Sequence, residues 1–270
     1  MCIRDRGCDV FLVQPTCAPV NDSLMELMIM VDACKRASAR QITAVIPYYG
    51  YARADRKTSG RESITAKLTA NLLEKSGVDR VLAMDLHSAQ IQGYFDIPCD
   101  HIYGSPVLID YLETLNLEEV VVVSPDVGGV ARARAFAKQM NDAPLAIIDK
   151  RRAAHNIAES LTVIGEVKGK TAILIDDMID TGGTICSGAS LLKREGAKRI
   201  FACASHAVFS PPSYERLSAK DLFEQVIVTN SIPVVVKNNF PQLKVLSVAN
   251  MLGEAIWRIH EESSVSSMFR

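Results

Sequence analysis

An excess of charge of either sign is missing from this sequence. Its 30 lysine and arginine residues are balanced by 31 aspartate and glutamate residues, which leaves a formal net charge of −1. A balanced chain has no overall field that would draw nucleic acid or an anionic membrane surface to it. We therefore expect neither of them as a partner, and any binding of anions has to depend on local clusters of residues.

The cysteines lack the spacing of a metal site or of a disulfide framework. There are seven of them, scattered along the chain, and none forms a CxxC pair. Such a pattern is typical of a reducing compartment. The chain also has no apolar run of the ~20 residues that cross a bilayer, and its first residues lack the apolar core of a signal peptide. We expect a cytoplasmic protein that is neither exported nor membrane-bound.

The composition does not have the low hydrophobicity of a disordered chain. The 270 residues are 48% hydrophobic and 23% charged, which suffices for one large core or two modest ones. Strand-like apolar runs alternate with segments of helical periodicity, which predicts an α/β fold with parallel sheets. The expected strands cover residues 9–14, 42–47, 80–84, 120–124, 146–149, 172–175, 200–205, 225–229 and 245–247. The expected helices cover residues 21–37, 64–75, 107–115, 130–140, 185–195 and 248–262, with Trp257 of the last helix in the core.

The stretch from Thr171 to Thr184, TAILIDDMIDTGGT, carries the most chemical information. Its apolar run predicts a buried parallel strand that ends on the carboxylates of Asp176 and Asp177. The TGGT turn after it is able to wrap backbone N–H groups around an anion, because glycine tolerates the φ values of such a nest. The next expected helix directs its positive dipole end at the same place. Carboxylates that accept hydrogen bonds from a sugar diol, beside a phosphate-binding loop, describe a cradle for ribose 5-phosphate.

Two further stretches point to a nucleotide. The run YYGYARADRK, which ends at Lys57, follows an expected strand and puts aromatic rings beside Arg53 and Arg56. Rings stack on a base and guanidinium groups clasp phosphates, so this turn suits a purine with a polyphosphate tail. His87 follows another expected strand, at the end where open α/β sheets place their ligands.

Each of these stretches also has a purely structural interpretation. A strand that ends in two aspartates before a glycine-rich turn occurs in ordinary βα connections. A basic turn is often solvated, and a lone histidine such as His87 is more often structural. The basic run from Lys150 to Arg152 is typical of a solvated face, although it would also suit a mobile clamp over a reacting polyphosphate. The residues alone leave these alternatives open.

A unit of strand followed by an anion-binding turn recurs along the chain. It occurs at Asp85-Leu86-His87, at Asp126-Val127-Gly128-Gly129 and in the stretch that ends at Thr184. The recurrence predicts two related α/β domains, residues 1–98 and residues 99–270. The final helix is a candidate to pack back on the first domain.

Together these motifs make the chain resemble the class I ribose-phosphate pyrophosphokinases of bacterial type, also called phosphoribosyl pyrophosphate synthetases. The resemblance begins near Arg6 and depends on six motifs in the family's order, with the C-terminal HEESSVSSMF in addition: YYGYARADRK, MDLHSAQIQGYFDIP, VSPDVGGVARAR, IIDKRRAAHNIAE, ILIDDMIDTGGT and VTNSIP. It implies two type I phosphoribosyltransferase-like domains and the assembly of dimers into a hexamer. It also implies transfer of the β,γ-diphosphoryl group of MgATP to the anomeric hydroxyl of ribose 5-phosphate, which yields phosphoribosyl pyrophosphate and AMP.

The resemblance assigns roles to individual residues. Those implied to bind ATP are Arg53, Asp55, Arg56 and His87, and those implied to hold Mg²⁺, directly or through water, are His87 and Asp126. Those implied to bind ribose 5-phosphate are Asp176, Asp177, Asp180, Thr181, Gly182, Gly183 and Thr184. Lys150 and Arg152 are the implied catalytic cations, which neutralise charge on the transferring group.

The sequence departs from the family at its start. The family's opening stretch, with a turn that reaches a neighbouring subunit's adenine site, has no counterpart, and MCIRD matches nothing in it. We therefore expect an N-terminally truncated chain, whose incomplete first domain exposes an unpaired sheet edge. Two other functions are considered: a non-catalytic regulatory homologue of the synthetase, and a phosphoribosyltransferase that consumes phosphoribosyl pyrophosphate. The retained charged residues argue against the first, and the ATP-type turn argues against the second.

Overall fold

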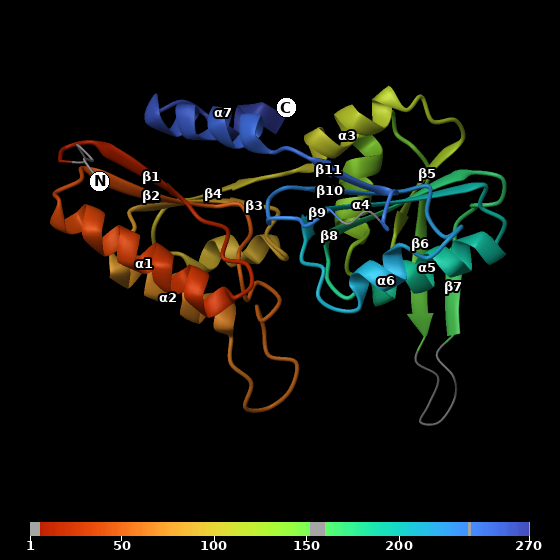
Figure 1. Cartoon of the computed structure of the whole chain (residues 1–270), viewed down its shortest axis with the longest axis horizontal. Coiled ribbons are helices and arrows are strands. Elements are labelled where there is room, and N and C mark those ends of the chain that lie inside the picture. The colour runs from red at the N-terminus through yellow and green to blue at the C-terminus, as the bar shows by residue number, and fades with distance from the viewer. Residues whose placement is uncertain (1–5, 152–159, 237–238, 270) are drawn as a thin grey trace. The chain divides into compact units, whose positions relative to one another are not determined.

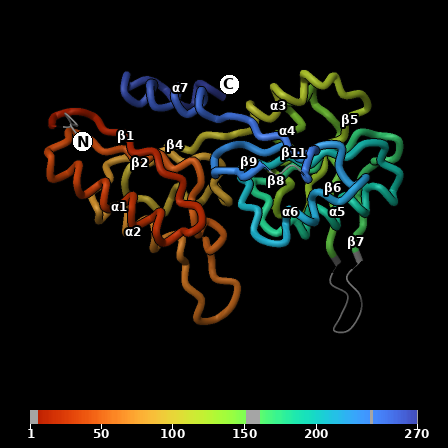
Figure 2. The backbone as a smooth tube through the Cα atoms, viewed as in Figure 1, coloured from red at the N-terminus to blue at the C-terminus, as the bar shows by residue number. Residues whose placement is uncertain are grey.

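The computed structural model describes residues 6–151, 160–236 and 239–269, and the chain divides into two compact units. The first unit comprises Met1–Gly104 and Val248–Arg270, and the second comprises Ser105–Ser247. Figure 1 labels the elements, and Figure 2 traces the backbone through both units. Each unit has its own sheet and its own cores, so that each is described by itself.

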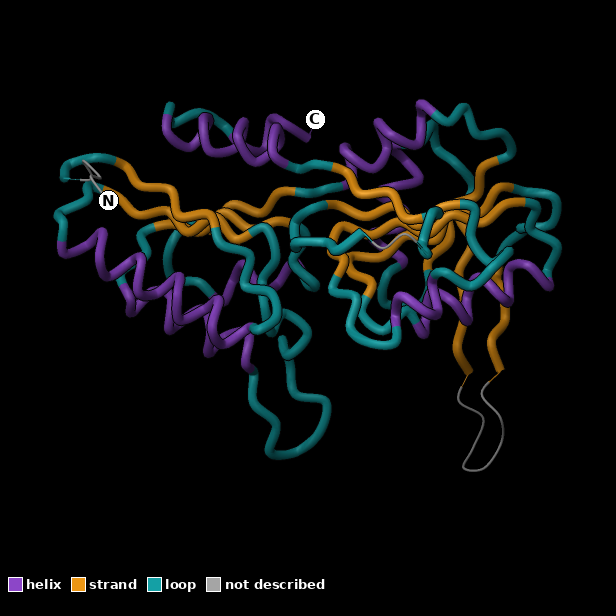
Figure 3. The backbone as a smooth tube through the Cα atoms, viewed as in Figure 1, coloured by secondary structure: helices purple, strands orange, loops and turns teal. Residues whose placement is uncertain are grey.

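The first unit is built on a four-stranded parallel sheet in the order β1-β2-β3-β4. Helices α1 and α2 cover one face of this sheet, and α7 covers the other (Figure 3). The central strands β2 and β3 are buried on both faces, so these two strands are largely apolar. The elements are β1 (Asp9–Val13), α1 (Val20–Arg36), β2 (Gln41–Ile46), α2 (Thr65–Ser76), β3 (Arg80–Met84), η1 (Ala89–Tyr94), β4 (Cys99–Ile102), α7 (Ala249–His260) and η2 (Val265–Phe269).

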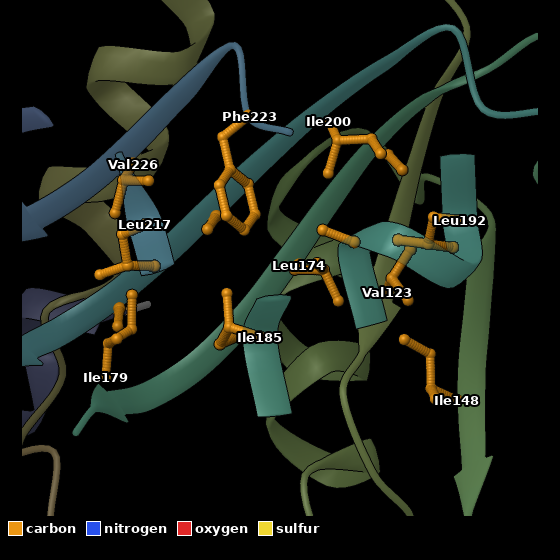
Figure 4. Close-up of a cluster of buried hydrophobic side chains, with 14 of the residues drawn as sticks. Val123, Ile148, Leu174, Ile179, Ile185, Leu192, Ile200, Leu217, Phe223 and Val226 are labelled. Carbon is orange, nitrogen blue, oxygen red and sulfur yellow. The ribbon is translucent and has the colours of Figure 1, made fainter. Parts of the chain in front are cut away.

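The second unit contains a seven-stranded sheet in the order β11-β10-β9-β8-β5-β6-β7, with β6 and β7 antiparallel and the other neighbours parallel. Helices α3 and α4 pack on one face, around Phe136. Helices α5 and α6 pack on the other, around Leu174, Leu192 and Leu217 (Figure 4). The elements are α3 (Ser105–Thr114), β5 (Val120–Ser124), α4 (Val130–Gln139), β6 (Leu145–Arg151), β7 (Ser160–Ile164), β8 (Thr171–Ile179), α5 (Gly183–Arg194), β9 (Arg199–Ala207), α6 (Ser213–Leu217), β10 (Gln225–Thr229) and β11 (Leu243–Leu246).

The boundary between the units lies a few residues beyond the one expected at residue 98. The short strand β4, which the sequence pattern does not reveal, pairs in parallel with β3. The N–H of Gly104 also donates to Oδ2 of Asp85 at 2.8 Å, so the chain up to Gly104 stays with the first sheet. The last segment joins the same unit, because Leu252 and Ala255 of α7 are buried in one cluster with Leu82 of β3.

Three further features differ from the sequence expectations. Strand β8 continues beyond Ile175 to Ile179, because β9 pairs with it as far as Ala207. Strand β7 begins at the end of a stretch that lacks periodicity. It pairs with β6 at the edge of the sheet, and its Leu161 and Val163 pack against the core that α5 and α6 cover. Trp257 is 55% exposed. It follows the buried Ala255 by two residues, about 200° around the helix, so it points away from the sheet.

No helix in the described part of the chain is both long enough and apolar enough to cross a bilayer.

Candidate functional site

Two carboxylates lie towards the carboxyl end of β8 and share one arginine. Nη1 of Arg132, in the first turn of α4, lies 3.0 Å from Oδ1 of Asp176 and 3.1 Å from Oδ1 of Asp177. The backbone N–H of Asp177 also donates to Oδ1 of Asp176 at 2.9 Å. The side chain of Asp177 is 2% exposed and that of Asp176 is 22% exposed. Asp176 is therefore the more accessible member of a pair that is held in place by one cation.

Burial and the neighbouring carboxylate change the ionisation of Asp176. Desolvation, followed by the hydrogen bond with Asp177 and the charge of Asp177, raises the pKa of Asp176 from 3.8 to about 8, against the opposing charge of Arg132. Two carboxyl groups this close do not both ionise readily, because their charges repel. At neutral pH the pair therefore holds a proton, and it presents both a donor and an acceptor of hydrogen bonds, which is the complement of a sugar diol.

The turn after β8 has the geometry of an anion-binding nest. Gly182 has a φ of +73°, a left-handed value that glycine adopts without strain, and α5 begins at the next residue. Gly182 has no side chain that could cap the helix, so the first N–H groups of α5 are left for another acceptor. Thr181 and Thr184 are exposed on either side of the turn, and Asp180 is half-buried before it. This arrangement suits a phosphate group.

Asp126 lies on the turn after β5, the strand next to β8 in the sheet. Its Oδ1 accepts from the N–H of Gly129 at 2.8 Å, and its carbonyl accepts from the hydroxyl of Ser124 at 2.7 Å. A Cβ added at Gly129 would lie 3.6 Å from Oδ1 of Asp126 and 3.9 Å from Nη1 of Arg132. The structure therefore brings the exposed carboxylate of Asp126 to the same sheet edge as the acidic pair.

Of the two expected catalytic cations, the structure describes one. Lys150 lies near the end of β6, with an exposed side chain, and pairs with Leu161 across the β6–β7 hairpin. Arg152 lies outside the described residues. The hairpin is thus the element of the second unit that carries the exposed charge of Lys150.

In the first unit, the turn after β2 exposes a cluster of cations. Arg53, Arg56 and Lys57 are exposed, and Asp55 between them is half-buried. The backbone carbonyl of Asp55 accepts a hydrogen bond from the hydroxyl of Tyr94, which ties this turn to η1. Exposed cations on an anchored turn suit the phosphates of a nucleotide.

The expected stack of aromatic rings in the same turn requires a correction. Tyr48 and Tyr49 are only 8% and 1% exposed, and the hydroxyl of Tyr49 donates to the carbonyl of Ala66 at 2.9 Å. These two rings are core residues, because they follow a buried strand directly and the sheet needs apolar cover there. Tyr51 is 38% exposed, so it alone of the three has an accessible ring.

His87 lies on the turn after β3, which is the strand next to β2 in the sheet. The side chain of His87 is exposed. Two residues earlier, Asp85 has a φ of +40°, an uncommon value for a non-glycine residue. The N–H of Leu86 donates to Nε2 of His101 at 3.0 Å, which helps to hold this backbone. Strained backbone of this kind is often found at functional sites. The carboxyl edge of the first sheet therefore presents the basic turn and His87 from neighbouring strands.

The donors present fit a magnesium ion that is held mainly by water and phosphate. In the described ranges, no group of three or more histidine, cysteine, aspartate and glutamate side chains is close enough to hold a metal by itself. Mg²⁺ does not require such a group, since it binds through one or two protein oxygen ligands and keeps several waters. The exposed carboxylate of Asp126 has the preferred chemistry, whereas the imidazole of His87 suits contact through water.

Arg132 is a site residue to which the sequence analysis gave no role. It lies three residues after Gly129, in the first turn of α4, and its partners are 44 and 45 positions away in the chain. A signal was present, because an arginine in the first turn opposes the helix dipole and is unusual there. An arginine at such a position often pairs with an acidic residue that is near in space, and it does not stabilise its own helix.

Two family models match the chain. The first, described as the N-terminal domain of ribose phosphate pyrophosphokinase, matches residues 4–77. The second, described as a phosphoribosyl synthetase-associated domain, matches residues 151–270. The matched segments lie in both structural units and contain the basic turn as well as the acidic pair and the glycine-rich turn.

Individual proteins are similar over almost the whole chain. The chain is 94% identical over 265 residues to a ribose-phosphate pyrophosphokinase of Prochlorococcus marinus subsp. pastoris. This match covers 98% of the chain and 80% of that protein. A ribose-phosphate pyrophosphokinase of Synechococcus elongatus is 77% identical over 265 residues, with the same coverage. The crystal structure of phosphoribosylpyrophosphate synthetase from Mycobacterium smegmatis is 46% identical, with a TM-score of 0.90 over 97% of this chain and 86% of that one.

Proposed function

The chain belongs to the family of ribose-phosphate pyrophosphokinases, and we propose that its residues carry out this reaction in the following way. The enzyme transfers the β,γ-diphosphoryl group of ATP to ribose 5-phosphate and releases AMP. The observation that carries the proposal is the succession of acidic pair and phosphate-binding turn on one strand-turn-helix unit, from β8 to α5. A diol and a phosphate at opposite ends of one ligand match this succession.

The ribose 5-phosphate site is formed by the end of β8 and the start of α5. We assign the two ribose hydroxyls to Asp176 and Asp177, which between them present a donor and an acceptor near neutral pH. We assign the 5-phosphate to the turn from Asp180 to Thr184, where the N–H groups of the nest and the helix dipole favour a dianion. Binding at both ends fixes the sugar, so that its anomeric hydroxyl is held in one orientation.

The chemical step needs charge stabilisation more than covalent help from the protein. The anomeric oxygen forms a bond to the β-phosphorus of ATP and its proton passes to water. The bond from that phosphorus to the α,β-bridging oxygen breaks, and the electron pair leaves with AMP. Negative charge builds up on the transferring group and on the leaving oxygen. Lys150 and Arg152 are proposed to neutralise this charge, and no protein nucleophile takes part.

ATP is assigned to the carboxyl edge of the first sheet. Arg53 and Arg56 supply exposed guanidinium groups for its phosphates. We assign Asp55 and His87 to the same ATP site. A bound Mg²⁺, for which Asp126 and His87 offer suitable donors, would neutralise phosphate charge and orient the polyphosphate.

The remaining proposals concern partners and location. The partners proposed are ATP, ribose 5-phosphate and further copies of this chain, in the dimers that form a hexamer in the family. No nucleic acid or membrane partner is proposed, since the chain is nearly neutral overall. A cytoplasmic location is proposed from the cysteine pattern.

Formation of AMP from MgATP and ribose 5-phosphate by the purified chain tests this function. We expect AMP only when ribose 5-phosphate is present. Lys150→Ala should lower kcat by about a hundredfold or more, because it removes a charge that acts mainly in the transition state. The matched control is Lys168→Ala, an exposed lysine of the same unit on the β7–β8 loop, which should leave kcat unchanged.

Two outcomes would contradict the proposal, each in favour of a different function. If ribose 5-phosphate binds but no AMP forms, the chain is a non-catalytic regulatory homologue. If pyrophosphate is released from phosphoribosyl pyrophosphate in a base-dependent reaction, it is a phosphoribosyltransferase. An equal loss of kcat in the Lys150 and Lys168 variants would remove the role given to Lys150.

A further inference from the structure

The short helix α6 supports the phosphate-binding turn from outside. Nη1 of Arg216 donates to the backbone carbonyl of Thr181 at 3.1 Å. The same atom would lie 3.4 Å from a Cβ added at Gly183, so the guanidinium group lies against the turn over more than one residue. The next residue of α6, Leu217, would lie 3.4 Å from a Cβ at Gly182. Two consecutive residues of α6 thus lie against three consecutive residues of the turn.

The position of α6 is fixed by the core of the second unit. Leu217 is 0% exposed and belongs to the same buried cluster as Ile179 and Ile185, which precede and follow the turn in sequence (Figure 4). The backbone N–H of Phe209, before α6, also donates to the carbonyl of Ile179 at 3.0 Å. Because Leu217 is immobilised in this cluster, the guanidinium group of Arg216 is presented to the turn by a rigid support.

The charge of Arg216 extends to the first turn of α5. Burial raises the pKa of Cys186 to about 11, and the charge of Arg216 acts in the other direction and lowers it. Cys186 is the residue whose N–H closes the first helical hydrogen bond to the carbonyl of Gly182, at 2.9 Å. The guanidinium group therefore acts at the point where the turn becomes a helix.

A hydrogen bond to the carbonyl of Thr181 has a consequence on the other side of the same peptide. In a planar trans peptide the C=O and the following N–H point in opposite directions. When Arg216 holds the carbonyl of Thr181 from outside, the N–H of Gly182 is directed to the inside of the turn. The positive φ of Gly182 then brings the next N–H groups to the same side, as an anion-binding nest requires.

We propose that Arg216 is a positioning residue for the 5-phosphate of ribose 5-phosphate. It holds the peptide between Thr181 and Gly182 in the orientation that binds phosphate before the substrate arrives, which lowers the cost of ordering the turn on binding. This inference rests on the proposed function, because it assigns the ligand of the turn to a sugar phosphate. It adds a residue that lies outside the turn and comes more than 30 positions later in the chain.

Steady-state kinetics of Arg216→Met test the proposal. Loss of a charge-assisted hydrogen bond should raise the KM for ribose 5-phosphate about tenfold, while the KM for MgATP and kcat change by less than about twofold. Arg216→Lys should fall between Arg216→Met and the wild type, since lysine keeps the charge but not the fork of donors. A role in folding alone would not separate the two substrates.

The matched control is Arg199→Met at the amino end of β9. Arg199 belongs to the same unit, pairs with Glu224 at 3.1 Å and lies over the ring of Phe201 at 5.1 Å, but it is at the far end of the strand from the turn. We expect the KM of the Arg199→Met variant for ribose 5-phosphate to equal that of the wild type. Equal effects of the two substitutions on this KM would overturn the proposal.

Chemical rescue keeps the test decisive if Arg216→Met folds poorly. Methylguanidinium added to Arg216→Ala should lower the KM for ribose 5-phosphate again, and it should have no effect on Arg199→Ala. Failure of rescue in a folded Arg216→Ala variant counts against the proposal. If the wild-type chain forms no AMP, the proposed function fails instead, and binding of ribose 5-phosphate to the Arg216 and Arg199 variants, followed by calorimetry, still tests the positioning role.

Discussion

The carboxyl pair of Asp176 and Asp177 makes the stability of the second unit depend on pH. The pKa of Asp176 is raised in the folded state to about 8 by burial and by Asp177, whereas an unfolded aspartate has its ordinary value of 3.8. Between these values the folded chain holds one proton that the unfolded chain has released. The free energy of unfolding therefore falls as the pH rises from about 4 to about 8, and this contribution is fully present only below the lower value.

Asp176→Asn should remove this dependence. An amide keeps the shape of the protonated carboxyl group and cannot ionise, so the variant is expected to be more stable than the wild type at pH 8, with little difference at pH 4. Above pH 8, where the wild-type side chain is ionised, its affinity for ribose 5-phosphate should fall below that of the wild type, because the variant offers the ligand one carboxylate fewer. Denaturant unfolding at the two pH values measures the first effect, and calorimetry measures the second. Parallel pH profiles of stability for the two proteins would contradict the assignment of the proton to this pair.

At the scale of a single element, strand β9 contains a bulge next to the site. Its register with β10 shifts after Val228, which leaves Ser205 as the extra residue. The carbonyl of Ser205 accepts the hydroxyls of Thr229 at 2.7 Å and Ser231 at 3.0 Å, and Nδ1 of His206 lies 2.9 Å from Oγ of Ser231. Since Ser231 donates its one proton to the carbonyl, His206 donates from Nδ1. Side chains thus replace the ladder bonds that the bulge removes.

Ser231→Ala and His206→Phe should each lower the free energy of unfolding by about 1–3 kcal/mol, because each removes the buried hydrogen bond between these two side chains. The double variant is expected to lose less than the sum, since the two side chains share one hydrogen bond. His206→Asn, whose amide nitrogen lies near the place of Nδ1, should recover part of the loss. Denaturant unfolding measures the free energy of unfolding of all four variants. Strict additivity would show that the two side chains act independently.

At the scale of the whole molecule, the two units differ in how their sheets are covered. The second unit is continuous in sequence, from Ser105 to Ser247, and contains helices for both faces of its sheet. The first unit needs two separate segments, because one face of its sheet is covered by α7 and the residues after it. Val45, Leu82, Met84 and Ile102 on that face are 0% exposed. Without the C-terminal segment this face would be open to water.

Residues 105–247 should therefore fold as an isolated fragment, and residues 1–104 should not. Exposure of each large apolar side chain costs about 1.5–3 kcal/mol, and several such side chains together exceed the stability of a small domain. Cooperative thermal unfolding, followed by circular dichroism, distinguishes the two fragments. Residues 1–104 joined by a linker to residues 248–270 are the control, and we expect this fusion to regain cooperativity. Cooperative unfolding of residues 1–104 alone would contradict the prediction.

Much of the fold and part of the site could be predicted from local sequence. The strands at Arg80–Met84, Val120–Ser124 and Gln225–Thr229 lie where the apolar runs indicate, because a short buried strand is specified by its own residues. Strand β4 and the extension of β8 could not be predicted, since both depend on a neighbouring strand that pairs with them. The burial of Tyr49 likewise depends on Phe95 and Ala66, which lie far from it in the chain.

The sequence by itself determined the α/β class and the strand-turn-helix unit that carries the acidic pair and the TGGT turn. These features follow from periodicity, from the φ values open to glycine and from the chemistry of neighbouring residues, all of which act over a few positions. Only the tertiary structure decided that Arg132 joins the two aspartates, that Arg216 holds the turn from outside and that α7 returns to the first unit. The physical reason is that each of these contacts joins residues far apart in the chain, and the packing of the sheets and helices alone brings them together.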